Sequence, residues 1–139
     1  ILILQGPNLN LLGLKSARIK ERLTLDKLNK KIKAEIKLQD VKLKFLQTHK
    51  TFQAINFLQR NRNKASGLLF IPTSWARTNY TILETINLIK IKTSVVYFEE
   101  PYNFGTNENE SIIQGENIKP FTGQPVSSCI EGLKRFLNK

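Results

Sequence analysis

The stretch Ile1-Leu-Ile-Leu-Gln5-Gly-Pro-Asn8-Leu-Asn10-Leu-Leu-Gly13 opens the chain and decides its fold. Its first four residues are all apolar, which is typical of a strand covered on both faces of a parallel sheet. Gly-Pro ends this run, and two asparagines follow in the turn. In an open α/β sheet, the loop after the first strand borders the crevice where ligands bind. The carboxamides of Asn8 and Asn10 therefore either bond a polyhydroxylated ligand or satisfy the loop's own backbone.

Apolar periodicity predicts the remaining elements. We expect strands at 41–45, 67–71 and 94–98, and helices from Thr24 as N-cap to about residue 38, from Thr51 as N-cap through residue 58, at 79–91 and at 126–137. A long loop at 99–120 leaves room for one more short strand. Strands that alternate with helices force a parallel sheet with right-handed crossovers. The expected fold is therefore α/β, a three-layer doubly wound, flavodoxin-like parallel sheet, and residues 1–139 are expected to form one domain.

Composition excludes several kinds of site. One cysteine, Cys129, rules out an internal disulfide, and its place in an expected helix predicts a buried, inert thiol. One histidine, His49, and one cysteine cannot make a metal set, and no glycine-rich phosphate loop occurs, so we expect neither metal nor cofactor. No apolar run approaches the length of a membrane span, which predicts a soluble protein.

The chain is strongly basic, with 22 Lys+Arg against 11 Asp+Glu and a net charge of +11. Such a balance predicts attraction to a polyanion, and a lysine-rich surface suits contact with a nucleic-acid backbone rather than base reading. Biased coding in an AT-rich genome is the alternative, because a basic surface then needs no partner. The candidate nucleic-acid contacts lie on the predicted helix after Thr24 and are Lys27, Lys30, Lys31, Lys33 and Lys37.

Two segments carry a specific family resemblance. The string from Gly6 to Gly13 closely resembles the start of type II dehydroquinases, the 3-dehydroquinate dehydratases, and Phe45-Leu-Gln47-Thr48 resembles their second strand, which ends in Gln-Ser. The length and the order of elements are similar from end to end. The resemblance implies the flavodoxin-like fold and a family that assembles as trimers and dodecamers, so a homo-oligomer is possible.

The resemblance also implies where catalysis would take place. Family members deprotonate the carbon beside the substrate ketone with a tyrosinate, which an arginine keeps ionised. An asparagine stabilises the enolate, and a histidine protonates the leaving hydroxyl. The matching positions here hold Lys15 for that arginine, Lys20 for the tyrosine, Ile71 for the asparagine, Arg77 for a substrate-positioning histidine, Glu99 for the acid and about Thr106 for a second arginine. His49 aligns beside the loop after the second strand and cannot replace the acid.

Loss of groups that act as a unit predicts an inactive member of the family, with no catalytic residues. We expect a structural or interaction subunit with protein and RNA partners in a larger assembly, such as an organellar ribosome. The expected location is a mitochondrion or plastid, and otherwise the cytoplasm.

Alternative chemistries stay open. One alternative to an inactive subunit is a divergent dehydratase with Lys20 as base. Another is a small-acid binding protein in which Asn8 is the retained ligand contact. Arg77 near a helix start suits an anion. Glu99 and Glu100 are an acid/base pair or, as we expect, a solvated loop edge.

Overall fold

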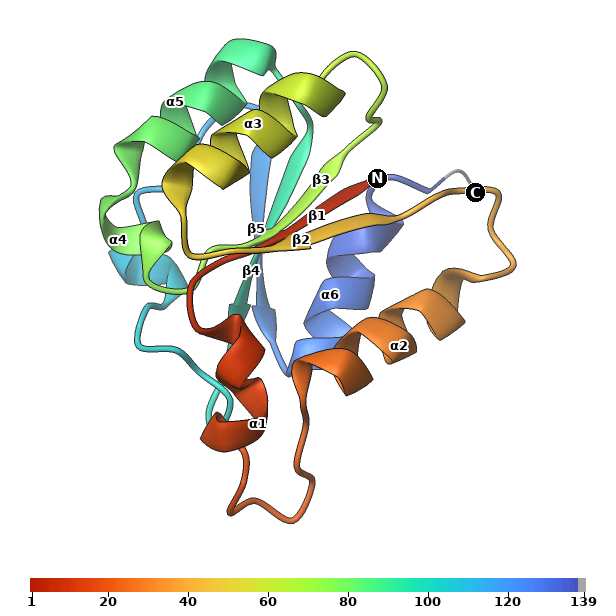
Figure 1. Cartoon of the computed structure of the whole chain (residues 1–139), viewed down its shortest axis with the longest axis vertical. Helices are drawn as coiled ribbons and strands as arrows, with labels where there is room; N and C mark the ends of the chain where they lie inside the picture. The colour runs from red at the N-terminus through yellow and green to blue at the C-terminus, as the bar shows by residue number, and fades with distance from the viewer. Residues whose placement is uncertain (138–139) are drawn as a thin grey trace.

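The computed structural model describes residues 1–137, in which five parallel strands form one sheet between two layers of helices (Figure 1). The strand order is β2-β1-β3-β4-β5, and this confirms the predicted doubly wound, flavodoxin-like α/β fold. The strands are β1 (Leu2–Gln5), β2 (Lys44–Gln47), β3 (Leu68–Ile71), β4 (Thr93–Phe98) and β5 (Ile118–Gly123). The helices are η1 (Leu9–Leu11), α1 (Leu12–Lys15), α2 (Leu25–Ile36), α3 (Thr51–Asn61), α4 (Trp75–Thr78), α5 (Tyr80–Ile89), η2 (Glu108–Glu110) and α6 (Pro125–Lys134).

The two cores explain why the central strands are apolar throughout. Leu2 and Leu4 of β1 pack in the core under α3 and α5, whereas Ile3 packs in the opposite core under α2 and α6. Because successive side chains of a strand point to opposite faces, each residue of β1 meets one of these helical layers. All four residues of β1 are buried as a result.

The observed element bounds depart from the predicted ones where pairing or capping decides them. β2 begins at Lys44 rather than at residue 41, because the amide of Lys44 donates to the carbonyl of Ile1 (2.9 Å) and the pairing with β1 starts there. Thr24 caps α2 as predicted, with its hydroxyl accepting from the amide of Lys27 (3.2 Å). Thr51, in contrast, is the first residue of α3, and Lys50 precedes it as N-cap.

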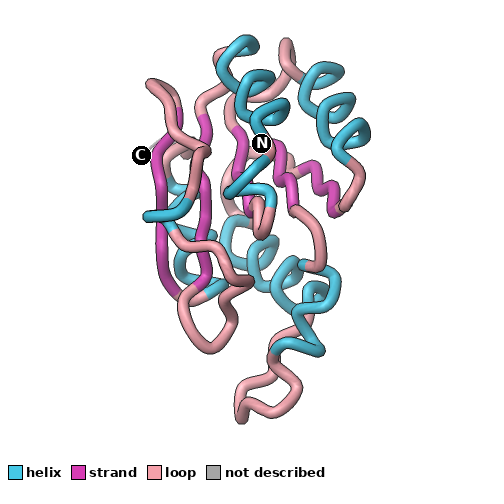
Figure 2. The backbone as a smooth tube through the Cα atoms, turned by 90° about the vertical axis from the view of Figure 1, so that its left-hand side faces the viewer, coloured by secondary structure: helices cyan, strands magenta, loops and turns pink. Residues whose placement is uncertain are grey.

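The carboxyl ends of the strands and their loops gather at one edge of the molecule. The loop between α1 and α2 projects from this edge beyond the sheet, as both views show (Figures 1 and 2). No helix within residues 1–137 is long and apolar enough to cross a membrane.

Candidate functional site

The turn after β1 is fixed to the turn after β3. The amide of Gly6 donates to the carbonyl of Ile71 (2.8 Å), and the hydroxyl of Thr73 donates to the carbonyl of Pro7 (2.7 Å). These bonds join the two strands between which the strand order reverses, the place where ligands bind in doubly wound folds. Asn8 follows in a left-handed conformation (φ 70°), exposed to solvent. Its carboxamide has no hydrogen-bond partner within residues 1–137, so it is free to bond a ligand.

Two of the aligned family positions lie at the end of α1 and in the loop between α1 and α2. Lys15 and Lys20 are both exposed. The buried Ser16 holds the loop's ends together, because its hydroxyl lies 2.9 Å from the carbonyl oxygen of Leu12 and accepts from the amide of Leu23 (2.9 Å). Lys20 therefore projects from a loop whose base is fixed.

The hollow at the carboxyl ends of β3 and β4, which we call the crossover hollow, is almost filled. Its volume is about 10 Å³, room for roughly one water molecule. Ile71 and Thr106, which the resemblance aligns with the family's asparagine and second arginine, line this hollow together with Phe104. Ile71 is 2 % exposed and has no polar atom in its side chain, so it cannot donate a hydrogen bond to an enolate.

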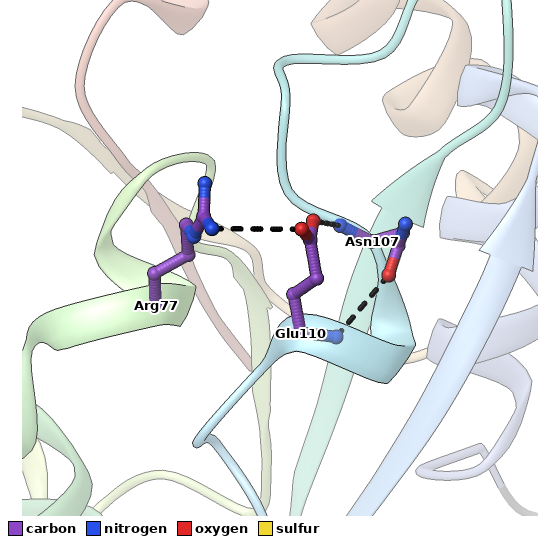
Figure 3. A network of polar contacts seen from close by, with 3 residues as sticks. All are labelled: Arg77, Asn107 and Glu110. Atoms are coloured by element: carbon purple, nitrogen blue, oxygen red, sulfur yellow. Dashed lines mark hydrogen bonds and ion pairs between the residues drawn. The ribbon is translucent and has the colours of Figure 1, made fainter.

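Arg77 is already paired with a carboxylate (Figure 3). Its Nη2 atom lies 3.5 Å from Oε2 of Glu110, and both side chains are partly exposed. The amide of Glu110 donates to the side-chain oxygen of Asn107 (3.2 Å), and a Glu110 carboxylate oxygen accepts from the amide of Asn107 (3.4 Å). The amide of Ile112 also donates to the carbonyl of Ala76 (2.7 Å). Arg77 therefore ties α4 to the loop after β4.

Glu99 and Glu100 are exposed at the end of β4. Both line one open surface hollow of about 510 Å³, beside Asn103 and Asn107. The amide of Glu99 donates to the carbonyl of Gly123 (2.9 Å), which fixes the backbone but leaves the carboxylate in water. His49 lies exposed just beyond β2, at the same edge of the sheet.

Another hollow lies between α2 and α6, and we call it the α2–α6 hollow. Its volume is about 580 Å³. It is bounded by the end of the loop before α2, by Tyr102 from the loop after β4 and by Gln124 after β5. Sequence reasoning missed this hollow, because α2 and α6 lie about 100 positions apart and each shows only an ordinary amphipathic pattern.

The five lysines expected to contact nucleic acid do not form one free cationic face. Lys30 pairs with Asp26 (3.1 Å), and the ammonium of Lys33 lies 5.2 Å from the centre of the Phe45 ring. Lys31 lines the α2–α6 hollow. Lys27 and Lys37 are exposed at opposite ends of α2.

Cys129 is buried in α6, as predicted, and burial raises the pKa of its thiol far above the usual range. Such a thiol is a poor nucleophile. In the part of the chain that the structure describes, no three His, Cys, Asp or Glu side chains are grouped so as to hold a metal ion.

Comparison with known proteins gives the family. The family model for Dehydroquinase class II matches residues 1–137. The 3-dehydroquinate dehydratase of Trichodesmium erythraeum is 30% identical over 138 residues, 99% of this chain and 92% of that protein. The 3-dehydroquinate dehydratase of Clostridium botulinum strain Hall is 26% identical over 99% of this chain and 94% of that protein. The chain belongs to the type II dehydroquinase family, as its opening motif predicted.

Solved structures agree on the fold. The type II dehydroquinase from Butyrivibrio crossotus superposes with a TM-score of 0.82 at 20% identity, covering 97% of this chain and 94% of that chain. The type II dehydroquinase from Propionibacterium acnes gives 0.81 at 18% identity, with 97% and 93% covered.

These comparisons overturn the functional prediction made from the sequence. The expectation of an inactive structural subunit in a ribonucleoprotein is wrong, because the relatives that match the whole chain are named for a catalytic activity. The interpretations that followed from it, of a pseudoenzyme, an RNA-binding or ribosomal protein and a mitochondrial location, are wrong as well. Net charge had suggested a polyanionic partner, but charge describes solubility and nonspecific attraction rather than fold or activity.

Proposed function

We propose that this chain is a divergent 3-dehydroquinate dehydratase, which eliminates water from 3-dehydroquinate or a close polyhydroxylated keto acid. The observation that supports the proposal is the family match across residues 1–137, together with the retained turn after β1 that holds Asn8 free at the ligand edge. A cytoplasmic location belongs to the same proposal.

The proposed reaction uses Lys20 as the base. A neutral amine takes the proton from the carbon beside the ketone, the C–O bond to the hydroxyl two carbons from the ketone breaks, and a C=C bond forms. The proton then passes to the departing oxygen, so that one water leaves and no charge accumulates. Asn8 is positioned to bond a substrate hydroxyl.

A spectrophotometric assay for the enone product tests the proposal. We expect turnover that falls about a hundredfold or more in Lys20→Ala, the effect typical of losing a general base. Lys27→Ala is the matched control, because Lys27 is also an exposed lysine and lies on α2. No turnover by the unaltered protein, or equal turnover in Lys20→Ala, would contradict the proposal.

Binding without turnover is the second candidate function. It is favoured by Ile71 at the enolate position and by the nearly filled crossover hollow. Calorimetry with shikimate, a cyclohexene carboxylate with three hydroxyls, separates the two functions. Shikimate binding with no enone from 3-dehydroquinate would support the second candidate, and no binding would exclude it.

We also propose that the protein is a homo-oligomer. Phe52 of α3 and Tyr80 and Leu88 of α5 are large, 62%, 65% and 74% exposed, and belong to the two helices that cover one face of the sheet. Exposed apolar side chains gathered on one layer favour association. Light scattering after size exclusion should give a mass above 16.0 kDa, the mass of one chain, and a monomer at all concentrations would contradict this.

A further inference from the structure

We infer that a hollow between β2 and α3 binds a small molecule that carries two or more phosphate groups. This hollow, which we call the β2–α3 hollow, has a volume of about 460 Å³, and α3 runs back along β2 beside it (Figure 1). It is separate from the candidate catalytic site, because none of its lining residues belongs to the turns after β1 and β3. The inference therefore does not depend on the proposed dehydratase activity.

The charge around the β2–α3 hollow has one sign. Lys44, Arg60 and Lys64 line it, and no carboxylate among residues 1–137 does. The sequence explains this imbalance, because residues 41–83 contain no Asp or Glu, although the chain has 11. The α2–α6 hollow, by contrast, is lined by as many acidic as basic side chains. A concave surface with charge of one sign concentrates the field and attracts ions of the opposite sign, so this hollow selects an anion.

The three cations are available to a ligand. Within residues 1–137 none of them forms an ion pair, and the side chains of Arg60 and Lys64 have no hydrogen-bond partner there. The ammonium of Lys44 donates to the side-chain oxygen of Asn61 (3.1 Å), and the Asn61 amide group donates to the carbonyl of Phe57 (2.7 Å). These bonds direct Lys44 along the hollow. An ammonium has three donors, so two of those on Lys44 stay free.

The free polar groups of the hollow are mainly hydrogen-bond donors. The side-chain oxygens of Gln53 and Asn61 already accept bonds, from the hydroxyl of Thr48 and from Lys44. An ionised phosphate group carries about two negative charges and has several acceptor oxygens in a small volume. The planar guanidinium of Arg60 suits two such oxygens at once. Three cations around one hollow therefore match two or more phosphate groups better than a single carboxylate.

The hollow also has an apolar part. Leu46 and Phe57 line it, and both are half-buried against the core under α3 and α5. An aromatic ring of this kind suits stacking by a flat organic group, such as the base of a nucleotide. Inorganic polyphosphate and phosphate esters share the charge that the cations recognise, whereas only an ester has a group for the apolar part.

A second copy of the chain is a poorer occupant of this hollow. A two-fold contact brings the same patch of both copies together. The three cations of one copy would then face the same three cations of the other, and like charges across an interface repel.

Calorimetry on the full chain tests the inference, with sodium tripolyphosphate and ATP as probes, in metal-free buffer at about 0.15 M KCl, where long-range attraction between exposed charges is largely screened. We expect both probes to bind. Amide chemical shifts locate the site, and we expect changes at Leu46, Phe57 and Asn61 and none at Thr73 or Ser127.

Two neighbouring arginines provide a matched pair of variants. Arg60→Gln should weaken tripolyphosphate binding about tenfold, the effect of one charge-assisted hydrogen bond. Arg62 is also exposed but does not line the hollow, and its Nη1 atom donates to the carbonyl of Gln59 (2.6 Å). Arg62→Gln should therefore change binding less than about twofold. Circular dichroism checks that both variants are folded.

Ligand controls separate the kinds of anion. Citrate carries three carboxylates and no phosphate, and it should bind at least about tenfold more weakly than tripolyphosphate. Tighter binding of ATP than of tripolyphosphate would support a phosphate ester whose ring contacts Phe57. Equal binding of these two probes would support inorganic polyphosphate as the ligand.

Four results would overturn the inference. They are no binding of either phosphate probe at millimolar concentration, equal binding of citrate and tripolyphosphate, equal weakening by Arg60→Gln and Arg62→Gln, and shift changes confined to residues outside the hollow. The enone assay is judged separately, because no residue that lines the hollow takes part in the proposed reaction.

Discussion

The phenol hydroxyl of Tyr102 donates a hydrogen bond to the carbonyl oxygen of Glu21 over 2.6 Å, across 81 positions of the chain. This bond joins the loop after β4 to the loop before α2, two segments that have no shared secondary structure. Tyr102 is 7% exposed and its ring packs in the core under α2 and α6. The hydroxyl is the only polar atom of this side chain. The bond therefore fixes one wall of the α2–α6 hollow and the base of the segment that carries Lys20.

Tyr102→Phe should remove this bond and keep the packed ring. We expect a loss of about 1 kcal/mol in the free energy of unfolding, because the carbonyl of Glu21 loses a donor but can reach water. Urea denaturation measures the change, and Tyr80→Phe, on an exposed ring, is the control that should show almost none. Equal stabilities of the two variants would contradict a structural role for the Tyr102 hydroxyl.

The sequence was sufficient to predict the fold because the fold depends on local patterns. The apolar run of β1 indicates a buried strand, and Thr24 indicates the start of a helix. Both signals lie within the element that they predict and depend little on distant residues. β2 was misplaced because its start depends on pairing between Lys44 and Ile1, which is a long-range contact.

The candidate site was harder to predict because it depends on partners. Aligned positions located Ile71 and Thr106 in one hollow, but the pairing of Arg77 with Glu110 and the small volume of that hollow appear only in three dimensions. The functional prediction was wrong for a related reason. It inferred loss of catalysis from the replaced side chains and an RNA partner from the net charge. Neither observation shows where a ligand can bind.

Gly6→Ala should destabilise the protein strongly. A Cβ atom at this position would meet the carbonyl group of Pro72, with the carbonyl carbon only 2.8 Å away, and this backbone belongs to the turn after β3. Forcing the two turns apart should cost about 2–3 kcal/mol, as overpacking does. Gly123→Ala is the matched control, because its Cβ would meet only Cβ of Ser128 at an ordinary 3.5 Å. Thermal denaturation should show a much larger decrease in Tm for Gly6→Ala than for Gly123→Ala, both relative to the unaltered protein.

The Cys129 thiol should be unreactive in the native protein. It is fully buried in the core under α2 and α6, and burial raises its pKa, so almost no thiolate forms at neutral pH. Modification by a chromogenic disulfide should therefore proceed only through unfolding, and its rate should increase with urea. Protein unfolded in urea should react at once and shows that the reagent is competent. Rapid, complete modification without denaturant would contradict the buried position.

Tyr97 should make the protein less stable in alkali. Burial is the main cause that raises the pKa of its phenol above the usual 10.0, and the nearby Glu108 carboxylate raises it further, whereas the hydrogen bond to Ser111 (2.5 Å) opposes the shift. Because the folded state holds this proton more tightly, the contribution is fully present below about pH 10 and is lost as the pH rises towards the folded pKa. Urea denaturation from pH 8.5 to 11 should therefore show a steeper fall in stability for the unaltered protein than for Tyr97→Phe. Tyr80→Phe, whose ring is 65% exposed, should fall as steeply as the unaltered protein, and parallel curves for Tyr97→Phe would refute the coupling.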